Sequence, residues 1–104
     1  MPLINSQSKG VFVISATPFT LSGDVDLESL DRAVDFYFEA GANGVTILGM
    51  MGEAPKLTHS ESAEVSARAI SRAGDHPVIV GVSAPGIAAI TELSKEVMDL
   101  ELPV

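Results

Sequence analysis

Three short apolar runs recur at nearly equal spacing, and they most constrain how this 104-residue chain can fold. They span residues 11–15, 44–48 and 78–82, so their first residues lie 33 and 34 positions apart. None of the runs alternates apolar with polar residues, which is typical of strands buried on both faces of a parallel sheet. Parallel neighbours need a long crossover between them, usually a helix. The spacing therefore predicts a repeated unit of one strand followed by one helix.

Helical patterns fill the segments after the apolar runs. Asp26 and Thr58 are residues that cap helix N-termini, and Thr58 with Glu61 forms a capping-box sequence. Gly41 is typical of the position just after a helix. The expected helices span residues 27–40, 59–73 and 87–100.

The length of the repeat decides between two α/β architectures. Residues 102–104 have the pattern of a fourth strand. Eight units of this period need roughly 265 residues, close to the ~250 of a (β/α)8 barrel. We therefore interpret residues 1–104 as one partial domain, the N-terminal three βα units of a (β/α)8 TIM barrel that is incomplete in this chain. An open doubly wound sheet is the alternative, although it usually needs about five strands.

Charge and composition exclude several classes of function. The chain has 6 Lys and Arg against 14 Asp and Glu, a formal net charge of −8, so we expect no nucleic-acid or anionic-membrane partner. It has no cysteine, and its two histidines lie in different segments, so we expect no metal site and no cofactor. No apolar stretch approaches the ~20 residues that span a bilayer or forms a signal-peptide core. A cytoplasmic location is expected.

Chemistry is expected in the loops after the strands, because ligands of parallel α/β folds bind at the carboxyl ends of the strands. The loop at residues 49–53, Gly-Met-Met-Gly-Glu, is the most informative. Its two glycines leave backbone N–H groups open to a carboxylate. The alternative, which the spacing alone favours, is that the glycines only turn the chain. The loop is neither a dinucleotide fingerprint nor a phosphate-binding P-loop.

Several short motifs follow one another along the chain. They are Ala16-Thr17-Pro18-Phe19, the loop at 49–53, Leu57 before a capped helix that contains His59 and Glu61, and the strand at 77–81. In this order and spacing, over residues 10–104, they resemble the N-terminal part of the dihydrodipicolinate synthase and N-acetylneuraminate lyase family. The resemblance implies a (β/α)8 barrel, usually tetrameric, that condenses or cleaves pyruvate through a Schiff base with a barrel lysine.

The resemblance implies that the loop at 49–53 receives the carboxylate of a pyruvate-like 2-oxo acid. Met51 stands where a family threonine binds that carboxylate through its N–H and hydroxyl, and methionine keeps only the backbone contact. Met50 stands where a threonine relays protons, and a thioether has no proton to pass. The methionines make the pocket more apolar, which suits a 2-oxo-acid or sugar-acid aldolase at least as well as the named synthase. The expected substrate-binding residues are Gly49, Met50, Met51, Gly52 and Thr17.

No catalytic residue is expected within the chain itself. A Schiff-base lysine must be buried enough to be neutral. The three lysines, Lys9, Lys56 and Lys95, fall instead in a tail, a loop and a polar helix face. The resemblance places the family's lysine and tyrosine beyond Val104, so these residues alone are expected to be inactive.

The other reactive residues have simpler interpretations. His59 stands where some members bind lysine as a feedback inhibitor, but the companion histidine is Ser62 here, so we interpret His59 as a polar surface residue. His76 is expected to fill a turn, and Glu53 to hydrogen-bond its own loop. No histidine is arranged to activate a serine or threonine nucleophile, namely Ser15, Thr17 or Ser83.

Two hypotheses follow for the function. The first is the N-terminal segment of a class I (Schiff-base) aldolase, lyase or synthase that acts on 2-oxo acids and forms a homotetramer or homodimer at full length. The second is a non-catalytic, truncated barrel piece with an assembly or interaction role. Three βα units leave unpaired strand edges and apolar faces that need a partner, which is the basis of the second hypothesis.

Overall fold

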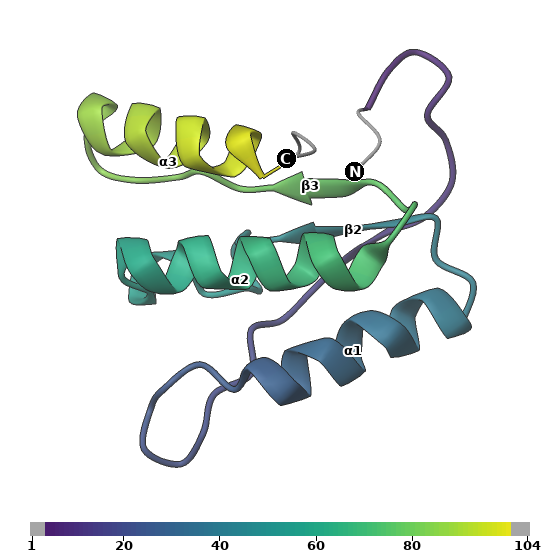
Figure 1. Ribbon diagram of the computed structural model, residues 1–104, viewed down its shortest axis with the longest axis horizontal. Helices are drawn as coiled ribbons and strands as arrows, with labels where there is room; N and C mark the ends of the chain where they lie inside the picture. Colours follow the sequence, from purple (N-terminus) through teal and green to yellow (C-terminus); the bar gives the residue numbers. More distant parts are fainter. Residues whose placement is uncertain (1–3, 101–104) are drawn as a thin grey trace.

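The fold is a three-stranded parallel sheet with a helix after each strand (Figure 1). The computed structural model describes residues 4–100. The sheet order is β1-β2-β3, and the strands are β1 (Phe12–Ile14), β2 (Gly44–Ile47) and β3 (Val78–Val80). The helices are α1 (Leu27–Glu39), α2 (His59–Ala73) and α3 (Ile87–Asp99), and a short 3-10 helix, η1 (Ala54–Lys56), precedes α2. The fourth strand expected at 102–104 lies outside the described residues.

The strands are shorter than the apolar runs, for a reason visible in the backbone. β2 ends before Leu48, because Leu48 has a φ of 58° and is not extended. One further hydrogen bond continues the sheet beyond the end of β1 and one beyond the end of β3. Ser15 N–H donates to the Thr46 carbonyl, and Gly81 N–H donates to the Ile47 carbonyl, both at 2.9 Å. The helices begin at the expected residues and end within one residue of the expected positions.

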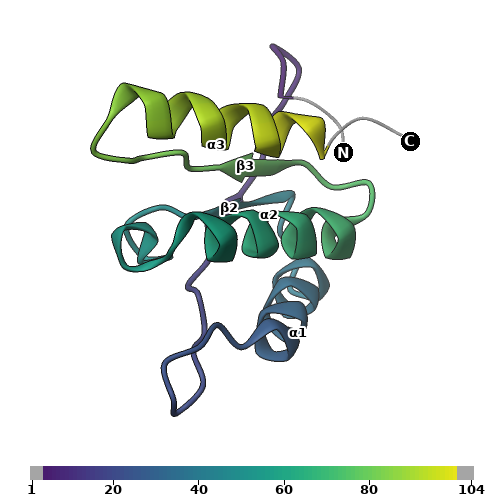
Figure 2. The ribbon, with the colours of Figure 1, turned by 60° about the vertical axis from the view of Figure 1, so that its left-hand side comes forward.

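Burial differs between the two faces of the sheet. Val45 and Ile47 of β2 are 0% and 1% exposed and belong to the core beneath α1 and α2. Ile14 and Ile79 are 52% and 40% exposed, so the expectation that all three strands are buried on both faces is wrong for β1 and β3. The register aligns both residues with Thr46, so the three share one face, opposite to Val45 and Ile47. Helices α1 and α2 cover only that opposite face (Figure 2).

Local capping explains where two of the helices begin. Asp26 accepts a hydrogen bond from Ser29 N–H at 3.0 Å at the start of α1. Thr58 accepts from Glu61 N–H at 3.1 Å, and the Glu61 carboxylate accepts from Thr58 N–H at 2.9 Å, which completes the capping box of α2. These side chains satisfy N–H groups that have no partner within the helix. The caps thus fix the two helices that carry most of the core.

Two ion pairs join α1 to α2 on the outside of the core. The Arg68 guanidinium donates to both carboxylate oxygens of Asp31, at 2.9 to 3.1 Å. Arg72 pairs with Asp35 in the same way, at 2.6 and 2.8 Å. The Arg72 guanidinium lowers the pKa of the Asp35 carboxyl. None of the helices within residues 4–100 is long and apolar enough to cross a membrane.

Candidate active site

The three loops that follow the strands meet at one edge of the sheet, where parallel strands present their carboxyl ends. Ser15 is 1% exposed, and its hydroxyl donates to the carbonyl of Ala16 at 2.8 Å. Its backbone N–H is bonded to β2, so Ser15 joins the first loop to the centre of the sheet. A hydroxyl held in this way is a structural contact.

Close backbone packing shapes the base of the second loop. Leu48 is 2% exposed and holds a positive φ of 58°, a conformation that non-glycine residues rarely adopt. A methyl group added at Gly81 would lie 2.4 Å from the Leu48 carbonyl oxygen. Only glycine therefore lets the end of β3 approach the end of β2 this closely. Burial of the Leu48 side chain offsets the strain of its backbone.

The loop at 49–53 forms a tight turn that leaves three consecutive backbone donors, at residues 49 to 51, without an acceptor among the described residues. Gly52 N–H donates to the Gly49 carbonyl at 3.2 Å, and Glu53 N–H donates to the Met50 carbonyl at 3.1 Å. Within residues 4–100, no carbonyl or side chain accepts from the N–H of Met50 or of Met51. The loop is therefore a tight turn that also presents adjacent N–H groups without acceptors.

A cleft of about 420 Å³ opens beside this loop. Met50 lies at its rim with a side chain that is 93% exposed. Met51 is 61% exposed and, like the buried Gly52 and Thr17, does not line the cleft. Of the five expected binding residues, the structure thus places only Gly49 and Met50 in the wall. The lining residues are Leu48, Gly49, Met50, Glu53, Ala54, Pro55, Lys56 and Ser83.

An ion pair that the sequence analysis missed lies in the wall of the cleft. The ammonium of Lys56 is 2.8 Å from a carboxylate oxygen of Glu53. This hydrogen bond and the charge of Glu53 raise the pKa of Lys56, so its amine stays protonated. The separation of three residues across η1 was the sequence signal for this pair. Glu53 thus bonds within its own loop region, as expected.

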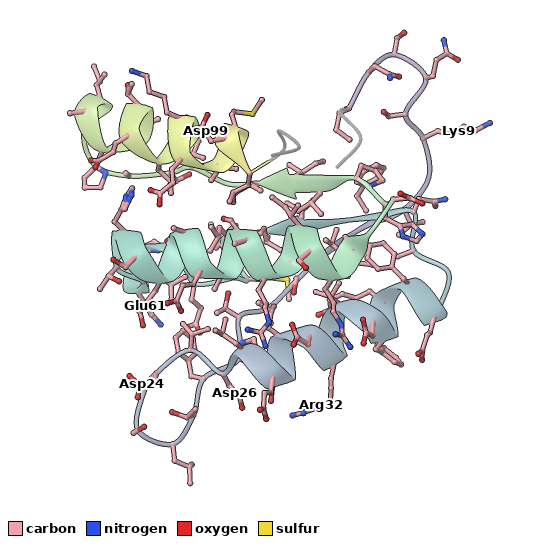
Figure 3. All side chains as sticks on the ribbon, viewed as in Figure 1. Lys9, Asp24, Asp26, Arg32, Glu61 and Asp99 are labelled. Atoms are coloured by element: carbon pink, nitrogen blue, oxygen red, sulfur yellow. The ribbon has the colours of Figure 1, made fainter. Side chains whose placement is uncertain are left out.

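None of the three lysines has the surroundings of a Schiff-base nucleophile. Lys9 projects from the N-terminal segment away from the sheet (Figure 3). The side chain of Lys56 is 72% exposed, and Lys95 is exposed on α3. A Schiff-base lysine needs a buried amine, which none of these exposed side chains provides.

The two histidines lie in separate places and make contacts that explain them. His59, at the start of α2, bonds through Nε2 to the Glu96 carboxylate of α3, at 2.5 Å. Sequence reasoning missed this contact, because the two residues are 37 positions apart. His76 stacks on Phe38 with ring centroids 4.0 Å apart, and its Nδ1 is 3.0 Å from the Ala73 carbonyl. Within the described part of the chain, no three His, Cys, Asp or Glu side chains gather as a metal site would require.

The sequence of the chain matches the profile of a known protein family. The sequence profile of the dihydrodipicolinate synthetase family matches residues 7–100. The chain belongs to this family. The family resemblance that the motifs carried is therefore confirmed.

Solved structures of the family share the fold. A dihydrodipicolinate synthase from Rhodopseudomonas palustris has a TM-score of 0.85 and 50% identity, over 89% of this chain and 31% of that chain. The enzyme from Acinetobacter baumannii, solved in complex with pyruvate, has a TM-score of 0.83 and 34% identity, over 88% and 32%. An N-acetylneuraminate lyase from Mycoplasma synoviae has a TM-score of 0.84 and 28% identity, over 89% and 32%.

The match covers only part of each relative. The curated 4-hydroxy-tetrahydrodipicolinate synthase from Kosmotoga olearia is 36% identical over 85 residues, which are 81% of this chain and 29% of the relative. The chain thus spans less than a third of the length of these relatives. It corresponds to the N-terminal part of their TIM barrels, so the expected fold class is confirmed.

Proposed function

We propose that this chain is the N-terminal segment, residues 1–104, of a Schiff-base aldolase, lyase or synthase that acts on a pyruvate-like 2-oxo acid. The observation that carries the proposal is the pair of unused N–H groups at Met50 and Met51, at the carboxyl edge of the sheet and beside a cleft. Adjacent backbone donors suit a carboxylate, because they need no side-chain charge to bind it. Family membership and the pyruvate complex of the Acinetobacter baumannii relative support a 2-oxo acid as the ligand.

In this proposal the chain binds and orients the substrate, and residues beyond Val104 carry out the covalent step. The loop at 49–53 forms the carboxylate end of the site. The amine of a lysine outside residues 1–104 attacks the keto carbon, and loss of water leaves the imine. The thioether of Met50 has no proton to pass. The proton relay of this protein is therefore built from other groups than in family members that have a threonine at this position. The exposed Met50 side chain instead enlarges the apolar wall.

The oligomeric state, the location and the need for cofactors are part of the same proposal. We propose a homo-oligomer, a tetramer or a dimer, of the complete protein, because the family is usually tetrameric. The cytoplasmic location expected from the sequence is proposed with it. The proposed reaction needs no metal and no organic cofactor, since the imine itself draws electrons from the carbon–carbon bond that forms or breaks.

Borohydride trapping of the complete native gene product tests the proposal. Incubation with pyruvate and borohydride should reduce the imine to a stable secondary amine and add a covalent mass to one lysine. Peptide mapping should place that lysine outside residues 1–104. Samples that lack either pyruvate or borohydride are the controls and should stay unmodified. The absence of an adduct with pyruvate and other 2-oxo acids would reject Schiff-base chemistry.

One observation favours a second candidate, a non-catalytic piece that acts in assembly. The apolar side chains of Ile14 and Ile79, on the two edge strands, are 52% and 40% exposed on one face of the sheet. Exposed apolar surface on a strand edge promotes association with another chain. The native gene decides between the two: a stop codon directly after Val104, with a product that elutes as an oligomer, would favour assembly.

A further inference from the structure

The cleft beside the loop at 49–53 contains a single basic side chain, that of Lys56. The other basic side chains lie outside the cleft, and three of them have hydrogen-bond partners of their own. Arg68 and Arg72 bond to aspartates of α1, and Arg32 donates to Ser29 at 2.8 Å. The chain as a whole has a net charge of −8. Lys56 is therefore the one cation of a wall that also holds the Glu53 carboxylate, in a chain of net negative charge.

Hydrogen bonds hold the backbone around Lys56, whereas its ammonium forms an ion pair that is exposed to water. Lys56 N–H donates to the Glu53 carbonyl at 2.9 Å, and Pro55 lies in the first turn of η1. The ammonium bonds to the Glu53 carboxylate, and the two side chains are 72% and 38% exposed. Ion pairs in contact with water are weak, because solvent screens them and both side chains lose freedom. An incoming anion can therefore take the place of Glu53 on Lys56.

The rest of the cleft suits an acid with two anionic groups. The wall of the cleft includes Met50, whose N–H has no acceptor, and the free N–H of Met51 follows directly in the chain. Apart from Lys56 and its partner Glu53, the wall is largely apolar, from Leu48, Ala54 and other lining residues. The volume of about 420 Å³ lies in the range of small-molecule sites. A ligand with one carboxylate leaves Lys56 with Glu53, whereas a ligand with two carboxylates engages both the free N–H groups and Lys56.

We propose that Lys56 is a specificity-determining residue that binds a second, distal carboxylate of the 2-oxo acid. This inference rests on the proposed function, since it concerns the same cleft. Lys56 thereby selects dicarboxylic 2-oxo acids over monocarboxylic ones of equal length. Glu53 opposes the selection, because its carboxylate competes for the same ammonium.

Two ligands of equal chain length test the inference on the complete native gene product. The probes are 2-oxoglutarate and 2-oxopentanoate, which share five carbons and differ in the distal carboxylate. The half-saturating concentration of each is measured by borohydride trapping. In the Lys56→Met variant, the value for 2-oxoglutarate should rise about tenfold while that for 2-oxopentanoate stays unchanged, as expected for loss of one charge-assisted hydrogen bond.

Three further variants separate this role from a structural one. Lys56→Arg should retain the preference, and Glu53→Gln should lower the half-saturating concentration of 2-oxoglutarate. Lys95→Met, which removes an exposed lysine on α3, should change neither value. An equal effect of Lys56→Met on both acids would overturn the inference and leave the proposed function standing. The absence of any adduct with either acid in the unmodified protein would instead reject the proposed function.

Discussion

Gly81 and Gly49 lie at the same edge of the sheet, yet a methyl group would meet different surroundings at each. At Gly81 it would lie 2.4 Å from the Leu48 carbonyl oxygen, whereas at Gly49 no atom lies within 4 Å. We expect Gly81→Ala to lower the free energy of unfolding by about 1–3 kcal/mol, the usual effect of overpacking. Gly49→Ala is the matched control and should change it by less than about 1 kcal/mol. Urea denaturation of the native gene product measures both, and equal effects would contradict the close approach.

The limits of sequence reasoning are clearest at single residues. The loop at 49–53 was identified from its glycines, but the positive φ of Leu48 that begins it was not, because leucine rarely adopts this conformation. The contact of His59 with Glu96 depends on how α2 packs beside α3. The exposure of Met50 at the rim depends on the turn of its loop. Such features come from tertiary packing, which spacing along the chain does not encode.

At the scale of the element, local chemistry explains why the helices were predicted better than the strands. The start of α2 depends on Thr58 and Glu61, which are neighbours in sequence and form the capping box that their order predicts. A strand, in contrast, ends where its partner strand ends. Leu48 leaves the sheet, so the apolar run that contains it extends beyond β2.

The N-cap of α1 gives a prediction for the acid range. Hydrogen bonds from the Ser29 backbone and side chain lower the pKa of Asp26 below its ordinary value of 3.8. The folded state therefore favours the ionised carboxylate. This stabilisation is fully present above the pKa that Asp26 has in the unfolded chain, and it is lost as the pH falls through the lower pKa that Asp26 has in the folded chain. Asp26→Asn keeps a good N-cap but does not titrate.

We expect the two proteins to have similar urea midpoints at pH 7. Between about pH 5 and pH 2 the midpoint of the unmodified protein should fall more steeply than that of Asp26→Asn. Asp35, whose pKa is also lowered, titrates in both proteins and cancels in the comparison. Parallel midpoint curves over this range would show that Asp26 does not stabilise the fold through its charge.

At the scale of the whole molecule, the covered and uncovered faces of the sheet indicate what completes it. α1 and α2 pack over Val45 and Ile47, while Ile14, Thr46 and Ile79 lie on the face that these helices do not cover. In a closed (β/α)8 barrel the helices surround the strands, and the inner face is filled by side chains from all strands. The exposed isoleucines thus stand where a barrel interior is expected.

If the barrel interior lies over this face, replacing an exposed apolar residue by glutamate should have different effects on and off the sheet. Leu21, at the tip of the loop before α1, is fully exposed, and Ile79 is 40% exposed on the sheet. If the native gene product closes its barrel over the sheet, Ile79→Glu places an unpaired carboxylate in the interior, at a cost of several kcal/mol. Its thermal midpoint should then fall by about 10 °C or more, or the protein should fail to fold. Leu21→Glu should shift the midpoint by only about 2 °C, because its side chain stays in water. Equal tolerance of both substitutions would mean that this face of the sheet stays open in the native protein, and the barrel proposal would be lost.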